Sequence, residues 1–85
     1  MLADEVLALL RCPETQQTLT RAAPDLVTHL EVLRAAGRLR DRAGHPCSAP
    51  VEAGLVRADG TLFYPIRDGI PVLIVPEAVT LPAEE

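Results

Sequence analysis

The stretch that decides the fold covers residues 54–75 and reads GLVRADGTLFYPIRDGIPVLIV. Two Asp-Gly pairs, at 59–60 and 68–69, divide it into three segments rich in aliphatic residues. Asp-Gly between apolar segments is typical of tight β-hairpin turns, because glycine takes a positive φ at little cost. The stretch therefore predicts an antiparallel β-meander of three strands, with a type I′ turn at the first Asp-Gly pair.

The position of that first turn also predicts the register of the hairpin. It sets Val56 opposite Phe63 and Leu55 opposite Tyr64, as cross-strand pairs of an antiparallel ladder. Successive side chains of a strand point to opposite faces of the sheet. The one phenylalanine and the one tyrosine of the chain are therefore expected on different faces.

The third strand, IPVLIV at 70–75, is expected at an edge of the sheet. Pro71 has no N–H to donate to a neighbouring strand, and such residues are confined to edges and strand starts. We expect Pro76 to end the strand and residues 77–85 to form a frayed tail. An extended aliphatic edge strand is a template for pairing with another polypeptide.

Two helices are predicted before the meander. Residues 2–10 carry apolar side chains at helical spacing, and residues 24–36 do so more clearly, with a leucine stripe at 26, 30 and 33. Pro24 and Gly37 suit the first position of the second helix and the position just after it. Burial of its stripe against the sheet is expected to stabilise a small domain.

The remaining segments complete the expected architecture. Residues 17–22 form a short strand pattern, and residues 38–50 read as a loop with a small hairpin near Ala43-Gly44. The fold class is therefore α+β: an antiparallel β-meander of three to four strands, a short N-terminal helix and one inserted helix. We expect residues 1–85 to form one domain, because the chain is short and has no long linker.

Composition narrows the function. Of the 85 residues 48% are hydrophobic, so a disordered chain is excluded, and the net charge is −4. An acidic balance with two aromatic residues does not favour direct DNA or RNA binding, which needs neutralised phosphates and stacking rings. Two cysteines, no secretory leader and no long apolar run predict a reduced, cytoplasmic protein away from membranes.

Two stretches together resemble a known family. LRCPET at 10–15 and YPIRDGIPVL at 64–73 resemble the small methyltransferase-activator family and its short bacterial relatives. In eukaryotes and archaea, members of that family are obligate partners of methyltransferases acting on tRNA, rRNA and a translation release factor. The likeness covers residues 2–20 and 54–79. It implies a non-catalytic subunit that stabilises an S-adenosylmethionine-dependent methyltransferase, with any RNA reached only through that partner.

The resemblance also implies that a zinc site has been lost. Cys12 matches the first metal ligand of the zinc-bearing relatives, whereas Thr15 and Arg57 stand where further cysteines are expected. A hydroxyl is a poor zinc ligand and a guanidinium cannot ligate the ion. We therefore expect no metal and no cofactor, with Cys12 a vestigial ligand position that serves as a small buried residue.

Alternatives remain open at this point. Cys12 with His45 and Cys47 offers three soft ligands, with His29 a remote fourth, so a stand-alone metal- or RNA-binding ribbon is the second reading. A homodimer through the edge strand is a third. A Cys12–Cys47 disulfide is disfavoured in a reduced compartment.

Catalysis is not expected. Nothing in the sequence ties His29 or His45 to Cys12 as a general base, and the sequence has no phosphate loop. The carboxylate pairs Asp4/Glu5 and Glu84/Glu85 lie near the ends of the chain. Arginines 34, 38, 40 and 42 form the most basic patch and read as a solvated helix end.

The segment after the second Asp-Gly turn is thus the predicted partner-binding site. Its prolines stiffen the turn and preset the following strand as extended, and Arg67 offers a bidentate donor to a carboxylate of this chain or of a partner. The predicted contact residues are Arg67, Asp68, Gly69, Ile70, Pro71, Val72, Leu73 and Ile74.

Overall fold

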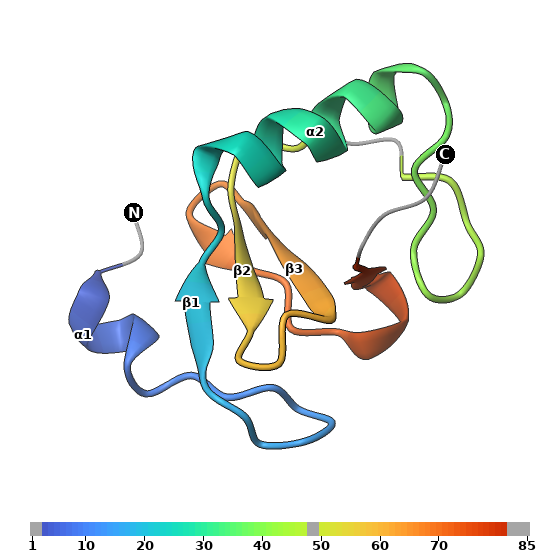
Figure 1. Cartoon of the computed structure of the whole chain (residues 1–85). Helices are drawn as coiled ribbons and strands as arrows, with labels where there is room; N and C mark the ends of the chain where they lie inside the picture. The colour runs from blue at the N-terminus through green and yellow to red at the C-terminus, as the bar shows by residue number, and fades with distance from the viewer. Residues whose placement is uncertain (1–2, 48–49, 82–85) are drawn as a thin grey trace.

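The computed structural model describes residues 3–47 and 50–81, and its centre is the predicted hairpin. β2 (Gly54–Arg57) pairs antiparallel with β3 (Leu62–Arg67). Val56 lies opposite Phe63, and Leu55 lies opposite Tyr64, so the predicted register is confirmed. Figure 1 shows this hairpin in the middle of the molecule, with α2 crossing above it and α1 lying beside β1.

The conformation of the first turn differs from the prediction. A type I′ turn needs positive φ at both central residues, but at 59–60 only the glycine has one, with φ 75°. The Asp59 carboxylate instead accepts hydrogen bonds from the backbone N–H and the hydroxyl of Thr61. These bonds hold the aspartate in its ordinary conformation. The positive-φ pair occurs in the second turn, at Asp68 (53°) and Gly69 (76°).

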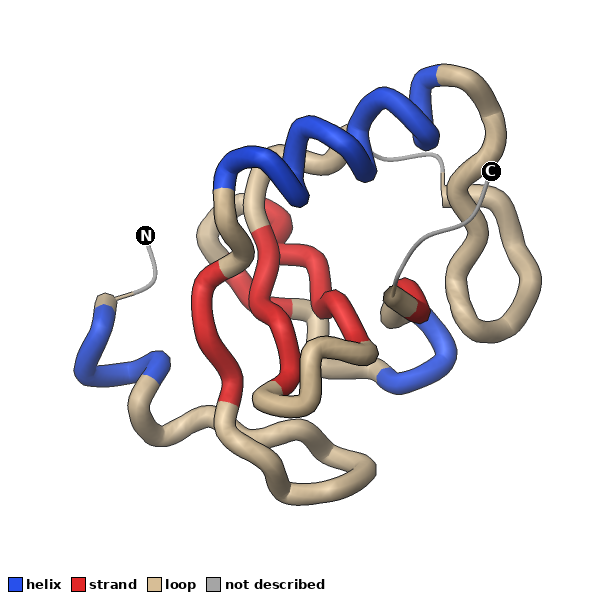
Figure 2. Tube along the Cα trace, in the orientation of Figure 1, coloured by secondary structure: helices blue, strands red, loops and turns tan. Residues whose placement is uncertain are grey.

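The sheet has the order β1-β2-β3-β4, all antiparallel. β1 (Leu19–Arg21) and β4 (Ile70–Pro71) end the order, and β5 (Val79–Thr80) pairs with the first residues of β3. Figure 2 shows how short these strands are and how much of the chain lies in connections. β4 therefore lies at the edge that Pro71 predicts.

Two predictions about the C-terminal part are wrong. The strand expected over 70–75 ends at Pro71, and a 3₁₀ helix, Val75–Glu77, follows. Beyond Val72, whose N–H donates to the Pro65 carbonyl over 2.8 Å, the ladder fails because Pro65 has no N–H to return. The expected tail at 77–85 is also no tail up to residue 81, because Ala78 and Val79 are buried. Residues 82–85 lie outside the described part.

The two helices occur where the sequence predicts them, with different lengths. α2 (Pro24–Ala35) is nearly the whole of the predicted 24–36 segment, with proline in its first turn. α1 (Asp4–Leu7) is much shorter than the predicted 2–10 helix, whose first residue lies outside the described part. The N–H groups of Leu9 and Leu10 bond three residues back, so the helix has already tightened and ended.

The sheet carries a different apolar cluster on each face. On one face Leu30 and Leu33 of α2 pack with Phe63. On the other face Cys12 and Tyr64 lie in the second cluster. The separation of Phe63 from Tyr64 confirms the predicted alternation. The whole arrangement is a curled antiparallel sheet with one short and one longer helix, so the predicted α+β class is confirmed.

The segment 38–50 is a loop with a small internal hairpin as far as it is described. An isolated bridge joins Arg40 to Pro46, and the Asp41 carbonyl accepts the Gly44 N–H across the turn. The loop also contacts the C-terminal segment, because the N–H groups of Arg42 and Ala43 donate to the carbonyls of Ala78 and Pro76. Residues 48–49 lie outside the described part.

Candidate functional site

The predicted partner-binding segment, 67–74, forms the turn after β3, the edge strand β4 and the irregular chain that follows. Arg67 and Asp68 are exposed at the turn, and Gly69 is half-buried. The Arg67 guanidinium lies 3.6 Å from a Glu77 oxygen of the same chain, which is a single long contact rather than a bidentate pair. The second turn is a type I′ turn, so the segment leaves β3 in a fixed direction.

The backbone of β4 offers few groups to an incoming strand. Because Val72 donates to the Pro65 carbonyl, the alternation of the ladder turns the Pro71 backbone away from β3, toward the outer edge. At that position proline supplies a carbonyl acceptor and no donor. Within residues 3–47 and 50–81 no further strand pairs with β4. The edge is open, but pairing along it is limited.

The side chains of the segment divide into two groups. Ile70 is 67% exposed and Ile74 is 50% exposed, whereas Pro71, Val72 and Leu73 are half-buried. Leu73 packs against the cluster that contains Cys12 and Tyr64. The outward apolar surface of the segment is therefore built from two isoleucines.

The N-terminal segment also exposes apolar side chains, which was not expected from the sequence. Leu7 and Leu10 pack against the same cluster as Leu73, while Val6 is 47% exposed and Leu9 is 80% exposed. Of the five large apolar side chains exposed in the described residues, four belong to the two segments that cover this face. We call Val6, Leu9, Ile70 and Ile74 the exposed aliphatic set.

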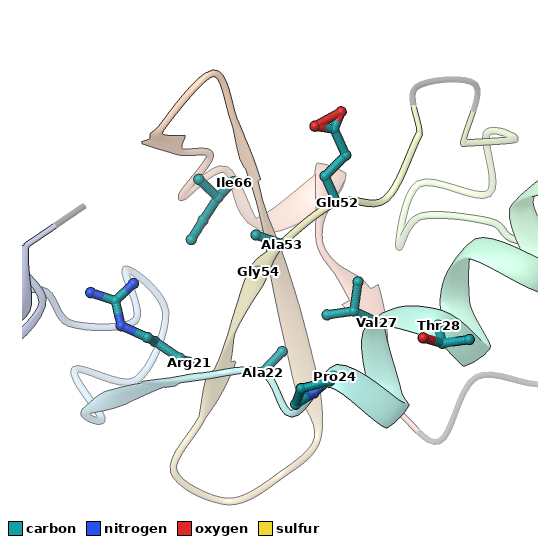
Figure 3. Close-up of a pocket in the computed structure, with 9 residues that line it drawn as sticks. All are labelled: Arg21, Ala22, Pro24, Val27, Thr28, Glu52, Ala53, Gly54 and Ile66. Atoms are coloured by element: carbon teal, nitrogen blue, oxygen red, sulfur yellow. The ribbon is translucent and has the colours of Figure 1, made fainter. Parts of the chain in front are cut away.

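Two neighbouring hollows lie near the end of β3. The larger, of about 340 Å³, opens between the start of α2, β1 and the beginning of β2, and Figure 3 shows its lining. The smaller, of about 210 Å³, shares Glu52 and Ile66 with it and extends to Arg67 and Asp68. Arg21 at the rim is paired with Asp4 over 2.9 Å, so the polar groups do not converge as in a small-molecule site.

Cys12, which was expected to be a vestigial ligand position, is buried beside a polar cluster. Cys12 has no exposed surface, and its Sγ lies 2.9 Å from the Tyr64 hydroxyl and 3.6 Å from Nη1 of Arg57. Thr15, in the turn that follows Cys12, also contributes to lowering the pKa of the thiol. The three positions that the resemblance assigns to former ligands, Cys12, Thr15 and Arg57, thus lie together in the fold.

Arg57 organises this cluster. Its guanidinium donates to Asp59 through Nε over 3.0 Å, to Glu14 through Nη1 over 3.0 Å and to the Thr61 hydroxyl through Nη2 over 2.7 Å. Only 10% of its side chain is exposed. These bonds raise the pKa of Arg57 and lower those of Asp59 and Glu14, so all three groups stay charged at neutral pH.

The pKa of Cys12 reflects the same contacts. Burial by itself raises the pKa of a thiol, but hydrogen bonds from Tyr64, Arg57 and Thr15 outweigh it and lower the pKa of Cys12 to about 6. The pKa of Tyr64 is raised, first by burial and then by its bond to the sulfur. Cys47 shows the opposite behaviour to Cys12, because burial and Asp41 raise its pKa.

The alternative metal site is not assembled. Cys47 packs in the cluster under α2, on the face opposite Cys12, so the sheet separates the two cysteines. Both thiols are free, and His29 and His45 are exposed. Within residues 3–47 and 50–81, no three His, Cys, Asp or Glu side chains come together as metal ligands would.

The basic patch is partly neutralised within the chain. Arg34 pairs with Glu31, and Arg42 pairs with Glu14 over 3.1 Å. Hydrogen bonds from Arg34 and from the Val51 N–H lower the pKa of Glu31 to about 2. The patch is thus mixed in charge. No helix in the described part of the chain is long and apolar enough to cross a membrane.

These features describe a small α+β domain with a buried polar cluster and an exposed apolar edge. A similar fold occurs in a protein from Xylella fastidiosa whose structure was determined by NMR in solution, with a TM-score of 0.75 and 24% sequence identity. The match covers 96% of this chain and 84% of that one. At this identity the likeness shows a shared fold. No protein-family model and no curated protein matches the chain.

Proposed function

We propose that this chain is a non-catalytic binding module that stabilises a partner protein, in the manner of methyltransferase-activator subunits. The observation that carries the proposal is the open sheet edge at β4, where Ile70 and Ile74 expose apolar side chains. An unpaired edge strand with exposed apolar side chains is a template for binding another polypeptide. The resemblance of residues 10–15 and 64–73 suggests an S-adenosylmethionine-dependent methyltransferase as the partner.

The edge strand β4 indicates how a partner would bind. Ile70 and Ile74 supply apolar contact, and the Pro71 carbonyl supplies one strand-like hydrogen bond. Because Pro71 has no N–H, side-chain burial contributes more than strand pairing. The smaller hollow, beside Arg67 and Asp68, is available to side chains of the same partner. Any cofactor or RNA belongs to the partner, and the free cysteines suit a reduced cytoplasm.

Affinity capture from the native cell with matched variants tests the proposal. The double variant Ile70→Asp, Ile74→Asp places two charges in the exposed aliphatic set, and Val32→Asp places one on the outer surface of α2, where Val32 is 61% exposed. We expect wild type and Val32→Asp to retain one partner at equal yield, and the double variant to lose it. A partner retained by the double variant would refute the proposed surface.

Two further measurements separate the alternatives. Mass spectrometry and a methyl-transfer assay on the captured complex show whether the partner is a methyltransferase. Metal analysis and light scattering on the purified chain test the two alternative hypotheses, a metal-binding ribbon and a homodimer. Stoichiometric zinc would favour a metal-binding ribbon, and a dimer that the Ile70→Asp, Ile74→Asp variant dissociates would favour self-association.

A further inference from the structure

One buried sulfur lies within hydrogen-bonding distance of side chains from two neighbouring strands. The Tyr64 hydroxyl of β3 lies 2.9 Å from Sγ of Cys12, and Nη1 of Arg57 in β2 lies 3.6 Å from it. Cys12 and Tyr64 both have no exposed surface. The contacts therefore form inside the fold, where water cannot replace them.

The chemistry of these neighbours bears on the direction of both bonds. A guanidinium can only donate, so the sulfur accepts from Arg57. A phenol 2.9 Å from sulfur can donate as well. A thiol is a weak acceptor that carries a proton of its own, whereas a thiolate accepts several charge-assisted bonds.

We infer that the native chain holds Cys12 as a buried thiolate, and that its pairing with Arg57 and Tyr64 locks the turn at 12–17 onto the β2–β3 hairpin. The lock joins segments 45 and 52 residues apart in sequence. It resides in the fold and is independent of the partner surface proposed above.

The charges around the sulfur are balanced so that such an anion is tolerated. Glu14 and Asp59 also face Arg57 and oppose a third negative charge, but each is bound elsewhere as well. Glu14 pairs with Arg42, and Asp59 accepts from Thr61 and from Gln17 over 3.2 Å. The guanidinium therefore retains an Nη1 donor for the sulfur. The lowered pKa of Cys12 agrees with this arrangement.

The inferred lock has a defined pH dependence. The pKa of Cys12 is about 6 in the fold, against 9.0 for an unperturbed thiol. A group whose pKa is lower in the folded chain stabilises the fold. This contribution is complete at a pH above the pKa of the unfolded chain, and it is lost as the pH falls through the pKa of the folded chain. The lock is therefore closed in neutral and basic solution and opens near pH 6.

The ultraviolet absorbance of the thiolate tests the inference directly. Cys47→Ala leaves Cys12 as the one thiol, and Cys12→Ser in the same background supplies the blank. Tyr64 is the single tyrosine and does not ionise below about pH 10. We expect folded Cys47→Ala protein to show a thiolate midpoint near pH 6. A midpoint at or above that of an ordinary thiol would overturn the inference.

Paired variants identify the cation responsible. In the Cys47→Ala background, Arg57→Gln is expected to raise the midpoint by about one pH unit or more, whereas Arg42→Gln, which contacts Glu14 and not the sulfur, leaves it nearly unchanged. An equal rise in the thiolate midpoint for both variants would show that Arg57 acts only through its positive charge and not through its contact with the sulfur. If Arg57→Gln does not fold, the titration of the Cys47→Ala protein still decides the protonation state.

Discussion

The two faces of the sheet are held by different forces. Under α2, Leu30, Leu33 and Phe63 pack as an apolar cluster with no polar centre. On the opposite face, Cys12 and Tyr64 share their cluster with a charged network around Arg57. The first face is stabilised by burial and depends little on pH, whereas the second combines burial with hydrogen bonds to charged groups.

The same contrast extends to the outer surfaces. α2 covers its face with one exposed large apolar residue, Val32, and polar neighbours. The face over Cys12 is covered by a four-residue helix and an irregular segment, which leave the exposed aliphatic set in solvent. A domain of 85 residues has a thin core, so one helix covers one face well and little chain remains for the other. The incompletely covered face is the one we propose for binding.

The largest expected effect is on the α2 face. Leu30 is fully buried, and Leu30→Ala removes its contacts and leaves a cavity that the sheet below cannot fill. We expect the free energy of unfolding to fall by about 2–5 kcal/mol, measured by urea denaturation. Val32→Ala on the exposed side of the same helix should change it by less than about 0.5 kcal/mol. Equal effects would show that α2 does not pack as described.

A second test of the same face adds volume. Gly54 is buried, and a Cβ placed on it would overlap the ring of Phe63, which lies diagonally across the hairpin. Gly54→Ala should therefore lower the free energy of unfolding by about 1–3 kcal/mol. The control is Phe63→Leu, which makes room for the added methyl group. We expect the double variant to lose less than the sum of the single losses.

The Cys12 face should instead respond to pH. From pH 6 to pH 8.5 the unfolded thiol binds a proton that the folded chain has largely released, so stability rises with pH. We expect a rise of about 2–3 kcal/mol in the free energy of unfolding of the Cys47→Ala protein. Cys12→Ala in the same background should flatten the rise, and the difference between the two proteins isolates the contribution of Cys12. A rise that persists without Cys12 would place the titrating group elsewhere.

The parts of this fold that follow from local rules were predictable from the sequence. The Asp-Gly turn fixed the pairing of β2 with β3, and the leucine stripe placed Leu30 and Leu33 inside. The conformation of the first turn was not predictable from the dipeptide, because the Asp59 side chain binds Thr61 and keeps its backbone out of the left-handed region.

The candidate site was less predictable, because it depends on contacts between distant residues. IPVLIV has the composition of a strand, yet the missing N–H of Pro65 ends the ladder, and Val79 instead occupies the site opposite Phe63. Arg57 donates hydrogen bonds to Glu14, Cys12 and Thr61, and no local pattern of the sequence predicts these contacts. The one sequence signal for this site was the alternation of side chains along the strand, which placed Tyr64 on the face away from Phe63.

The smallest expected effect on stability separates binding from folding on the Cys12 face. Ile70 is mostly exposed, so Ile70→Asp should lower the free energy of unfolding by less than about 1 kcal/mol, largely through strand propensity. Leu73 packs against the Cys12 cluster, and Leu73→Asp buries an unpaired charge there, so its loss should be several-fold larger. Thermal and urea unfolding of both variants measure the difference. If Ile70→Asp destabilises the chain as much as Leu73→Asp does, Ile70 belongs to the core, and the surface we propose for a partner is already occupied by the chain itself.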